Sequence, residues 1–208
     1  MDIAVSLVET YLRANGYLTL SEIPVIRRVR GEYRNVTDID IVGLRFPGDV
    51  LPPRQVDRHP ELVLMHDPLL IDEPDVVDLI IGEVKQGEAR LNRGLRSREA
   101  IHSVLHRVRW LFPPGGVDEA LDDLASGKLI HRVATARGAT LQVRLVAFGQ
   151  SDRVDKHVIS LSHIIRAGMD HLEQNQAVLG AAKMNAVAGE FLQLLVKTGH
   201  VVVEVEGE

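Results

Sequence analysis

The segment VVDLIIGEVKQ, residues 76–86, constrains the fold more than any other part of the chain. It is rich in β-branched residues and nearly continuously apolar, which is typical of a strand buried on both faces of a sheet. Such a strand needs a covering layer on each side, and helical patterns occur at residues 2–15 and 95–112. The sequence therefore predicts a layered α/β domain with this strand inside a mixed sheet.

The remaining patterns fit the same layered arrangement. Further strands and a short helix are expected: strands at 17–27, 37–46 and 139–149, a shorter strand at HVISL, and a helix at 117–125. Pro24 favours an edge position for the first strand, because proline cannot donate to a sheet ladder. The Arg-rich segment RRVRGEYRN between the first two strands is interpreted as a turn.

Proline content and helical pattern divide the chain into two predicted parts. Residues 47–76 hold six prolines and many acids, which indicates a long irregular insertion. We expect residues 1–160 to form the core around this insertion. Residues 161–208 are expected to form a helical extension, broken near Gly180 or Gly189, that packs on the core and ends in the strand VVVEVE.

Composition excludes several classes of function. The chain of 208 residues has no cysteine, which excludes disulfides, thiol catalysis and cysteine-type zinc sites. Aromatic residues make up only 4%, too few for the base-stacking platforms of single-strand binding proteins. The beginning of the chain does not read as a secretory signal, and no apolar run approaches the ~20 residues of a membrane span. We therefore expect a cytoplasmic protein with no membrane partner.

Charged residues within the predicted buried strands are the main sign of a functional site. Glu83 and Lys85 are two residues apart and share a face, as do Asp38 and Asp40 on the preceding strand. A buried carboxylate is costly unless it is paired or binds a metal. If the two strands pair, Asp40 and Glu83 come within reach of one Mg²⁺ (or Mn²⁺), which prefers oxygen ligands. Lys85 would then offer a positive charge to a phosphate.

These residues resemble a known family. The succession of a helix, TDIDIVG, an insertion and LIIGEVKQ is similar to the PD-(D/E)XK nuclease superfamily. The pattern of an acid, any residue, Asp and two aliphatic residues at 38–42 is closest to the Holliday-junction-resolvase-like branch. The resemblance covers residues 1–149. The gap from Asp40 to Glu83 is longer than usual in the family, which we attribute to the insertion at 47–76.

The resemblance implies both a fold and an activity. The fold is the restriction-endonuclease-like αβββαβ core, with a mixed central sheet flanked by helices and here followed by the C-terminal helical extension. The implied activity is metal-dependent hydrolysis of phosphodiester bonds, which we expect to act on DNA. The implied metal ligands are Asp40 and Glu83, and the implied catalytic set adds Lys85 and, from the first helix, Glu9.

Each of these assignments has a simpler alternative. Glu-x-Lys is a weak motif by itself, because a chain with 29 acids and five lysines is expected to contain about one by chance. Glu83 and Lys85 could form a surface ion pair at a strand end. Glu9 could be a solvated residue at the edge of its helix, and Asp38 could merely solvate the end of its strand.

Two groups of arginines border the predicted site, although the chain carries a net charge of −5. Arg28 and Arg30 precede the Asp40 strand, while Arg93, Arg96 and Arg98 follow Lys85. The guanidinium group suits bidentate contacts with phosphate, so these five are the candidate nucleic-acid-binding residues. The alternative is a solvated helix face.

Three functional hypotheses remain open at this point. The first is the metal-dependent nuclease. The second is a catalytically silent module on the same fold that binds nucleic acid or protein. The third is a small α/β protein in which the motif is a coincidence and no metal binds. A homodimer is also expected, because the helices after residue 160 and the strand VVVEVE exceed what the core needs and offer apolar interfaces.

Overall fold

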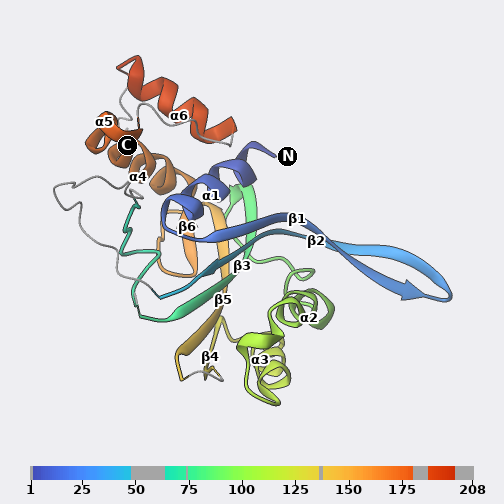
Figure 1. Ribbon diagram of the computed structural model, residues 1–208. Helices are drawn as coiled ribbons and strands as arrows, with labels where there is room; N and C mark the ends of the chain where they lie inside the picture. The colour runs from blue at the N-terminus through green and yellow to red at the C-terminus, as the bar shows by residue number, and fades with distance from the viewer. Residues whose placement is uncertain (1, 48–63, 74, 136–137, 180–186, 200–208) are drawn as a thin grey trace.

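A mixed six-stranded sheet forms the centre of the protein, and helices cover both of its faces (Figure 1). The computed structural model describes residues 2–47, 64–73, 75–135, 138–179 and 187–199. The strand order is β1-β2-β3-β5-β4, with β6 paired to β5. The strands are β1 (Leu18–Val29), β2 (Glu32–Arg45), β3 (Val77–Glu88), β4 (Ile130–Ala134), β5 (Thr140–Gln150) and β6 (Val158–Ser160).

The strand directions make the sheet mixed. Strands β1, β2 and β3 form an antiparallel meander, and β5 then pairs with β3 in parallel. The connection between β3 and β5 carries α2 (Arg98–Arg107), the short helix η1 (Arg109–Leu111) and α3 (Gly116–Ala125). β4 is antiparallel to β5, and β6 is parallel to it. The predicted α/β class with a mixed sheet flanked by helices is confirmed.

Two apolar clusters lie on opposite faces of the sheet. One face is covered by α1 (Ile3–Ala14), α4 (Leu161–Gln174) and α6 (Val187–Lys197), and the other by α2 and α3. On β3, Ile80 and Val84 belong to the first cluster, whereas Leu79 and Ile81 belong to the second. The expectation that β3 is buried on both faces is therefore confirmed.

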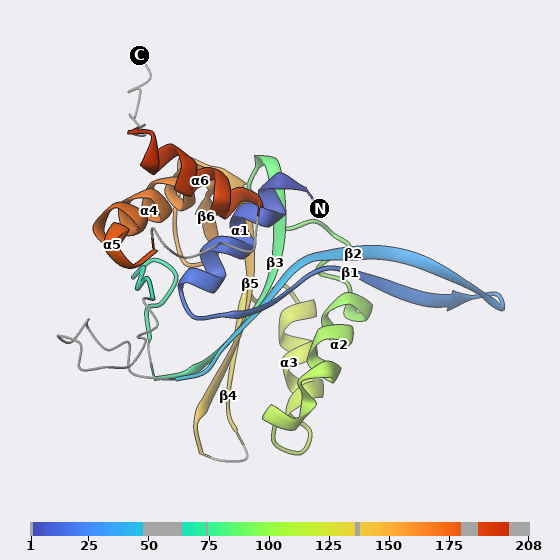
Figure 2. The ribbon, with the colours of Figure 1, turned by 45° about the horizontal axis from the view of Figure 1, so that its top comes forward.

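The β1–β2 hairpin extends well beyond the rest of the sheet as a two-stranded arm (Figures 1 and 2). Pairing continues to Val29–Glu32, and only Arg30 and Gly31 form the turn, with φ values of 51° and 92°. The interpretation of RRVRGEYRN as a turn was therefore wrong. Two successive residues with positive φ are typical of the tight hairpin turn whose twist matches that of the flanking strands.

The remaining elements depart from expectation in smaller ways. Strand β4 was not predicted. The C-terminal helices are interrupted after Gln174, ahead of α5 (Gln176–Leu179), whereas Gly189 lies inside α6. Gly180, VVVEVE and residues 48–63 of the predicted insertion lie outside the described residues. The described end of that insertion, residues 64–73, contributes Met65, Leu70 and Ile71 to the core.

Candidate functional site

The candidate site lies where β2 and β3 separate. Their pairing runs from Arg45–Asp78 to Ile41–Gly82, and Asp40 and Glu83 are the next residues on the two strands. Asp40 Oδ2 accepts a hydrogen bond of 2.7 Å from the backbone N–H of Val84. A side chain thus replaces a ladder bond at the point of separation. We call Asp40, Glu83 and Lys85 the fork cluster.

Glu83 is the most deeply buried member of the fork cluster. Its side chain is 1% exposed, and that of Lys85 is 40% exposed. Glu83 Oε1 forms an ion pair with Lys85 Nζ and accepts a hydrogen bond of 2.5 Å from Asn92 Nδ2. Glu83 Oε2 is also buried and has no hydrogen-bond partner among the described residues. A buried carboxylate oxygen without a partner is unusual and points to a ligand supplied from outside the chain.

Burial dominates the electrostatics of the two carboxylates. Burial raises the pKa of Glu83, and the nearby charge of Asp40 raises it further, against the opposing effect of Lys85. Burial likewise raises the pKa of Asp40, although the Val84 N–H and Lys85 act to lower it. Both shifts show that the charged forms are disfavoured here. A cation bound between the two carboxylates would relieve that cost.

The structure brings three of the four predicted catalytic residues together and places the fourth in a different network. Glu9 is 4% exposed, so the alternative of a solvated residue at the helix edge was wrong. Its Oε1 accepts hydrogen bonds from Arg13 Nη2 at 2.8 Å and from Thr19 Oγ1 at 3.1 Å. Both partners lie outside the fork cluster, and Arg13 neutralises the Glu9 charge.

Asp2 is the acid of α1 that acts on the fork cluster, and sequence reasoning missed it. Its Oδ1 caps α1 by accepting from the Ala4 N–H at 2.7 Å, and its Oδ2 accepts from Gln86 Nε2 at 3.0 Å. Its charge contributes to the raised pKa of Asp40. An acid directly before an apolar helical pattern is a helix-cap signal, so its position on α1 could have been predicted.

Asn92 is the second residue that sequence reasoning missed. It lies in the loop of residues 89–97, and its Oδ1 accepts from the Leu95 N–H at 2.6 Å while its Nδ2 holds Glu83. Gly94 in the same loop packs so closely on β2 that a Cβ there would lie 2.6 Å from Thr37 Oγ1. This loop therefore contacts both of the separating strands.

The predicted arginines lie on the loop that carries Asn92, at the start of α2 and on the β1–β2 arm. Arg93 and Arg96 belong to the loop of residues 89–97, and Arg28 and Arg30 belong to the β1–β2 arm. Arg98 begins α2, and its Nη1 bonds to Asp122 Oδ1 at 2.6 Å. The other predicted acid, Asp38, is exposed and accepts from Asn35 Nδ2 at 2.9 Å.

The donor set suits a metal ion that keeps water in its coordination shell. Among the described residues, no group of three or more His, Asp or Glu side chains is arranged to hold a metal. Asp40 and Glu83 offer two carboxylates, one of them with an unpartnered oxygen. Mg²⁺ commonly binds proteins through one or two carboxylates and fills the rest of its shell with water and substrate oxygens. The residues therefore fit Mg²⁺.

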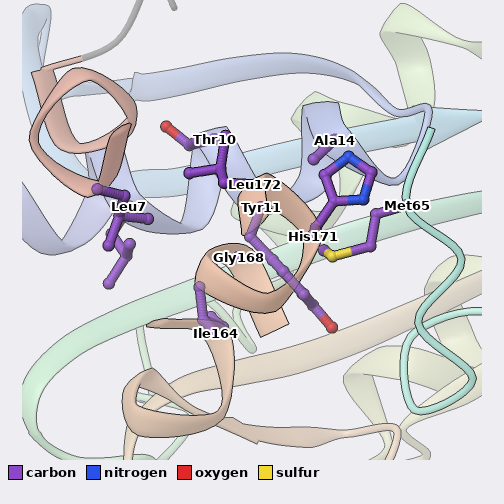
Figure 3. Close-up of a pocket in the computed structure, with 10 residues that line it drawn as sticks. Leu7, Thr10, Tyr11, Ala14, Met65, Ile164, Gly168, His171 and Leu172 are labelled. Carbon is purple, nitrogen blue, oxygen red and sulfur yellow. The ribbon is translucent and has the colours of Figure 1, made fainter. Parts of the chain in front are cut away.

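An apolar pocket elsewhere has a different chemical character. It lies between α1, α4 and α6, and Figure 3 shows Leu7, Tyr11, Ile164 and His171 among the residues around it. The fork cluster does not contribute to its lining, which is mainly aliphatic. The convergence of two carboxylates of raised pKa, Asp40 and Glu83, makes the fork cluster the candidate functional site.

Comparisons of the chain with models of protein families, with curated proteins and with solved structures find no significant match. In the parts of the chain that the structure describes, no helix combines the length and apolarity needed to span a membrane. Function is therefore inferred from the residues of the fork cluster and from the segments that surround it.

Proposed function

We propose that the protein is a Mg²⁺-dependent nuclease of the PD-(D/E)XK superfamily that hydrolyses phosphodiester bonds in DNA. The observation that carries this proposal is the burial of Glu83 beside Asp40 with one carboxylate oxygen left without a partner. The succession of α1, the antiparallel strands β1 to β3, α2 and the parallel strand β5 supports it, because it follows the αβββαβ order of the restriction-endonuclease-like core. β4 is an addition to that order.

The three residues of the fork cluster would have different roles in the reaction. Asp40 and Glu83 would hold the metal, which when bound polarises a phosphate oxygen and lowers the pKa of a water molecule. Lys85 is half-exposed and keeps donors available beyond its ion pair with Glu83. Its ammonium group would orient the attacking water and stabilise the negative charge that develops on the phosphate.

Residues around the fork cluster complete the proposed site. Asn92 holds the Glu83 carboxylate in position, and Asp2 adds negative charge near Asp40. Arg93 and Arg96, on the loop that carries Asn92, would contact the backbone phosphates on either side of the reacting one. Glu9 has no part in the mechanism proposed here, because Arg13 and Thr19 occupy its Oε1.

The test compares two substitutions that separate metal binding from chemistry. Asp40→Ala should weaken Mg²⁺ binding and abolish cleavage together, because it removes a ligand. Lys85→Ala should retain metal binding but slow cleavage by about 10²–10³-fold, the loss expected for one electrostatic stabiliser. Calorimetric titration with Mg²⁺ and single-turnover cleavage of linear and branched DNA measure the two effects.

Glu88→Ala is the matched control, because Glu88 is an acid at the exposed end of the same strand, with 78% of its side chain accessible. It should bind metal and cleave like the wild type. Wild-type cleavage by Lys85→Ala would reduce Lys85 to an ion-pair partner of Glu83. Metal and DNA binding without any cleavage by the wild type would favour the silent binding module instead.

The expected homodimer stays a prediction. Helix α6 exposes Val187, Phe191 and Leu194, which recur at helical spacing along one side of the helix. A second copy of the chain would cover such a stripe, and two copies would place two fork clusters on one duplex.

A further inference from the structure

The β1–β2 arm has a buried base and an exposed outer part. Ile23, Val25 and Ile39 at its base are buried in the apolar cluster that α2 and α3 share. Beyond them, residues 26–36 form the outer part, and all of its described side chains are exposed. Figure 2 shows this part of the hairpin projecting away from the sheet and the helices. The fold therefore exposes a two-stranded ribbon, and one of its strands is β2, which also carries Asp40.

We propose that the outer part of the arm, residues 26–36, enters the major groove of B-form DNA and so makes double-stranded DNA the substrate. This inference rests on the proposed nuclease function and specifies the nucleic acid that the fork cluster acts on. The arm and the fork cluster share β2, so a duplex held by the arm is held at a fixed place relative to Asp40.

The dimensions of the arm match those of the groove. Two paired strands lie about 4.8 Å apart, and residues 26–29 of β1 extend for about 13 Å at the usual rise per residue. The major groove of B-DNA is about 12 Å wide and about 8.5 Å deep, and it admits a two-stranded β-ribbon. The exposed outer part of the arm is therefore long enough to reach the base edges.

The charge of the arm matches a polyanion. It carries Arg27, Arg28, Arg30 and Arg34 against a single acid, Glu32. Arg27 bonds to Glu99 of α2 at 2.9 Å, so one face of the ribbon is tied to the core. Arg28 pairs across the strands with Tyr33 and lies 5.9 Å from the centre of its ring.

Strand alternation sets Arg28 and Tyr33 on the opposite face from Arg27. The face that carries Arg28 and Tyr33, together with Arg30 in the turn, presents two arginine side chains and one aromatic ring to a partner. Arginine is the residue that most often reads guanine in the major groove, through a bidentate contact.

The same features disfavour other nucleic acids. The major groove of A-form RNA is deep and too narrow for protein side chains to read. Single-strand binding relies on successive aromatic platforms, and Tyr33 is the only aromatic residue of the arm. We therefore expect binding to fall from duplex DNA to single-stranded DNA and duplex RNA.

Equilibrium binding with the full-length Lys85→Ala protein tests the proposal without cleavage. Fluorescence anisotropy would compare a DNA duplex of about three helical turns with an RNA duplex and a single DNA strand of the same sequence. Adding Arg28→Ala and Arg30→Ala should weaken duplex DNA binding about tenfold or more. The slope of log K against log salt concentration should also become shallower by nearly one for each phosphate contact that is lost. The control variant adds Lys128→Ala in place of the two arginine substitutions. Lys128 is an exposed lysine in the connection from α3 to β4, and its loss should change the affinity by no more than about twofold.

A second variant removes the arm and keeps its base. Replacing residues 27–34 by Asn-Gly joins Ile26 to Asn35, which already pair across the hairpin, through a favoured two-residue turn. Circular dichroism and a thermal melt show that this variant is folded before its binding is measured. It should lose the preference for duplex DNA over duplex RNA.

The outcomes separate this inference from the proposed nuclease function. Equal affinity for duplex RNA, or unchanged binding of duplex DNA by both arm variants, overturns the groove assignment even if the wild type cleaves DNA. Arm-dependent binding of duplex DNA by a wild-type protein that never cleaves it supports the groove assignment and overturns the nuclease.

Discussion

Two buried acids on β3, Asp78 and Glu83, have opposite surroundings. Asp78 is 2% exposed and Glu83 is 1% exposed. Asp78 accepts hydrogen bonds from Arg144, Tyr17 and Gln142. Glu83 keeps one oxygen without a partner among the described residues. Burial alone therefore does not distinguish the two acids; the number of hydrogen bonds that the fold supplies to each does.

The Asp78 network joins distant parts of the chain. Arg144 is fully buried, and its Nη2 donates to Asp78 Oδ2 and to the Leu70 carbonyl, both at 2.6 Å. Its Nη1 donates to the Lys156 carbonyl at 2.9 Å. Burial and the neighbouring Asp78 charge raise the pKa of Tyr17, so its hydroxyl stays a donor. This network ties residues 64–73 and the connection before β6 to the centre of the sheet.

The largest effect should come from breaking the Asp78 network. Asp78→Ala leaves the Arg144 guanidinium buried without its carboxylate, which should lower the free energy of unfolding by about 3–5 kcal/mol. Glu83→Gln should leave that free energy unchanged or raise it at pH 7, because the raised pKa of Glu83 shows that folding disfavours its charge. Urea unfolding measures both variants.

A double variant, Asp78→Ala with Arg144→Met, serves as the control for this prediction. It should recover part of the loss, because no buried charge remains unpaired. If Glu83→Gln destabilises the protein as much as Asp78→Ala, the fork cluster is a structural network like that of Asp78.

A smaller effect should come from adding metal. Mg²⁺ binds the folded state through Asp40 and Glu83 in our proposal, so at about 100 times its Kd it should stabilise the fold by about 2.7 kcal/mol. Asp40→Asn should remove this stabilisation, and Glu88→Gln on the exposed end of β3 should not. Thermal unfolding with and without Mg²⁺ gives the comparison. Equal stabilisation of wild type and Asp40→Asn would place the metal elsewhere.

The smallest effect should come from a third buried acid, Asp67, which resembles Asp78. Its Oδ2 accepts from Tyr11 Oη at 2.8 Å and bonds with His163 Nε2 at 2.6 Å. Burial acts to raise the pKa of Asp67, but these hydrogen bonds outweigh it and hold the pKa below its usual value. Its stabilisation is therefore present above the unfolded-state pKa and is lost as pH falls through the lower folded-state pKa.

Asp67→Asn should accordingly lower the free energy of unfolding by about 1–2 kcal/mol at neutral pH, with the difference shrinking in acid. Glu83→Gln should show the reverse trend, because the pKa of Glu83 is raised: any gain should grow as pH rises past the ordinary glutamate value. Urea unfolding at a series of pH values measures both trends. Parallel trends in the two variants would remove the distinction between the two kinds of acid.

Strand periodicity was sufficient to predict the centre of the molecule. The shared face of Glu83 and Lys85 and the approach of Asp40 follow from a period of two and from pairing of neighbouring strands. The pairing of Asp78 with Arg144 could also have been predicted, because a charged residue within an apolar strand requires a buried partner.

The contacts that sequence reasoning missed depend on tertiary structure. Asn92 bonds to Glu83, and Asp2 bonds to Gln86 beside Lys85, only because the loop of residues 89–97 and α1 pack where they do. The arm lacks alternating apolar residues because neither of its faces is buried, so it gives no strand pattern. Its strands are defined by backbone pairing and by the turn at Arg30 and Gly31.

The parallel pairing of β3 with β5 has a consequence for how the chain folds during synthesis. Val77 pairs with Leu141, so β3 receives its second neighbour only after about 60 further residues have been made. Until then the meander of β1, β2 and β3 presents an apolar strand with an unpaired edge, a form prone to association with other chains. Such long-range pairing also slows folding. We therefore expect Asp40 and Glu83 to meet early, and the burial that raises the pKa of Glu83 to be complete only when β5 closes the sheet.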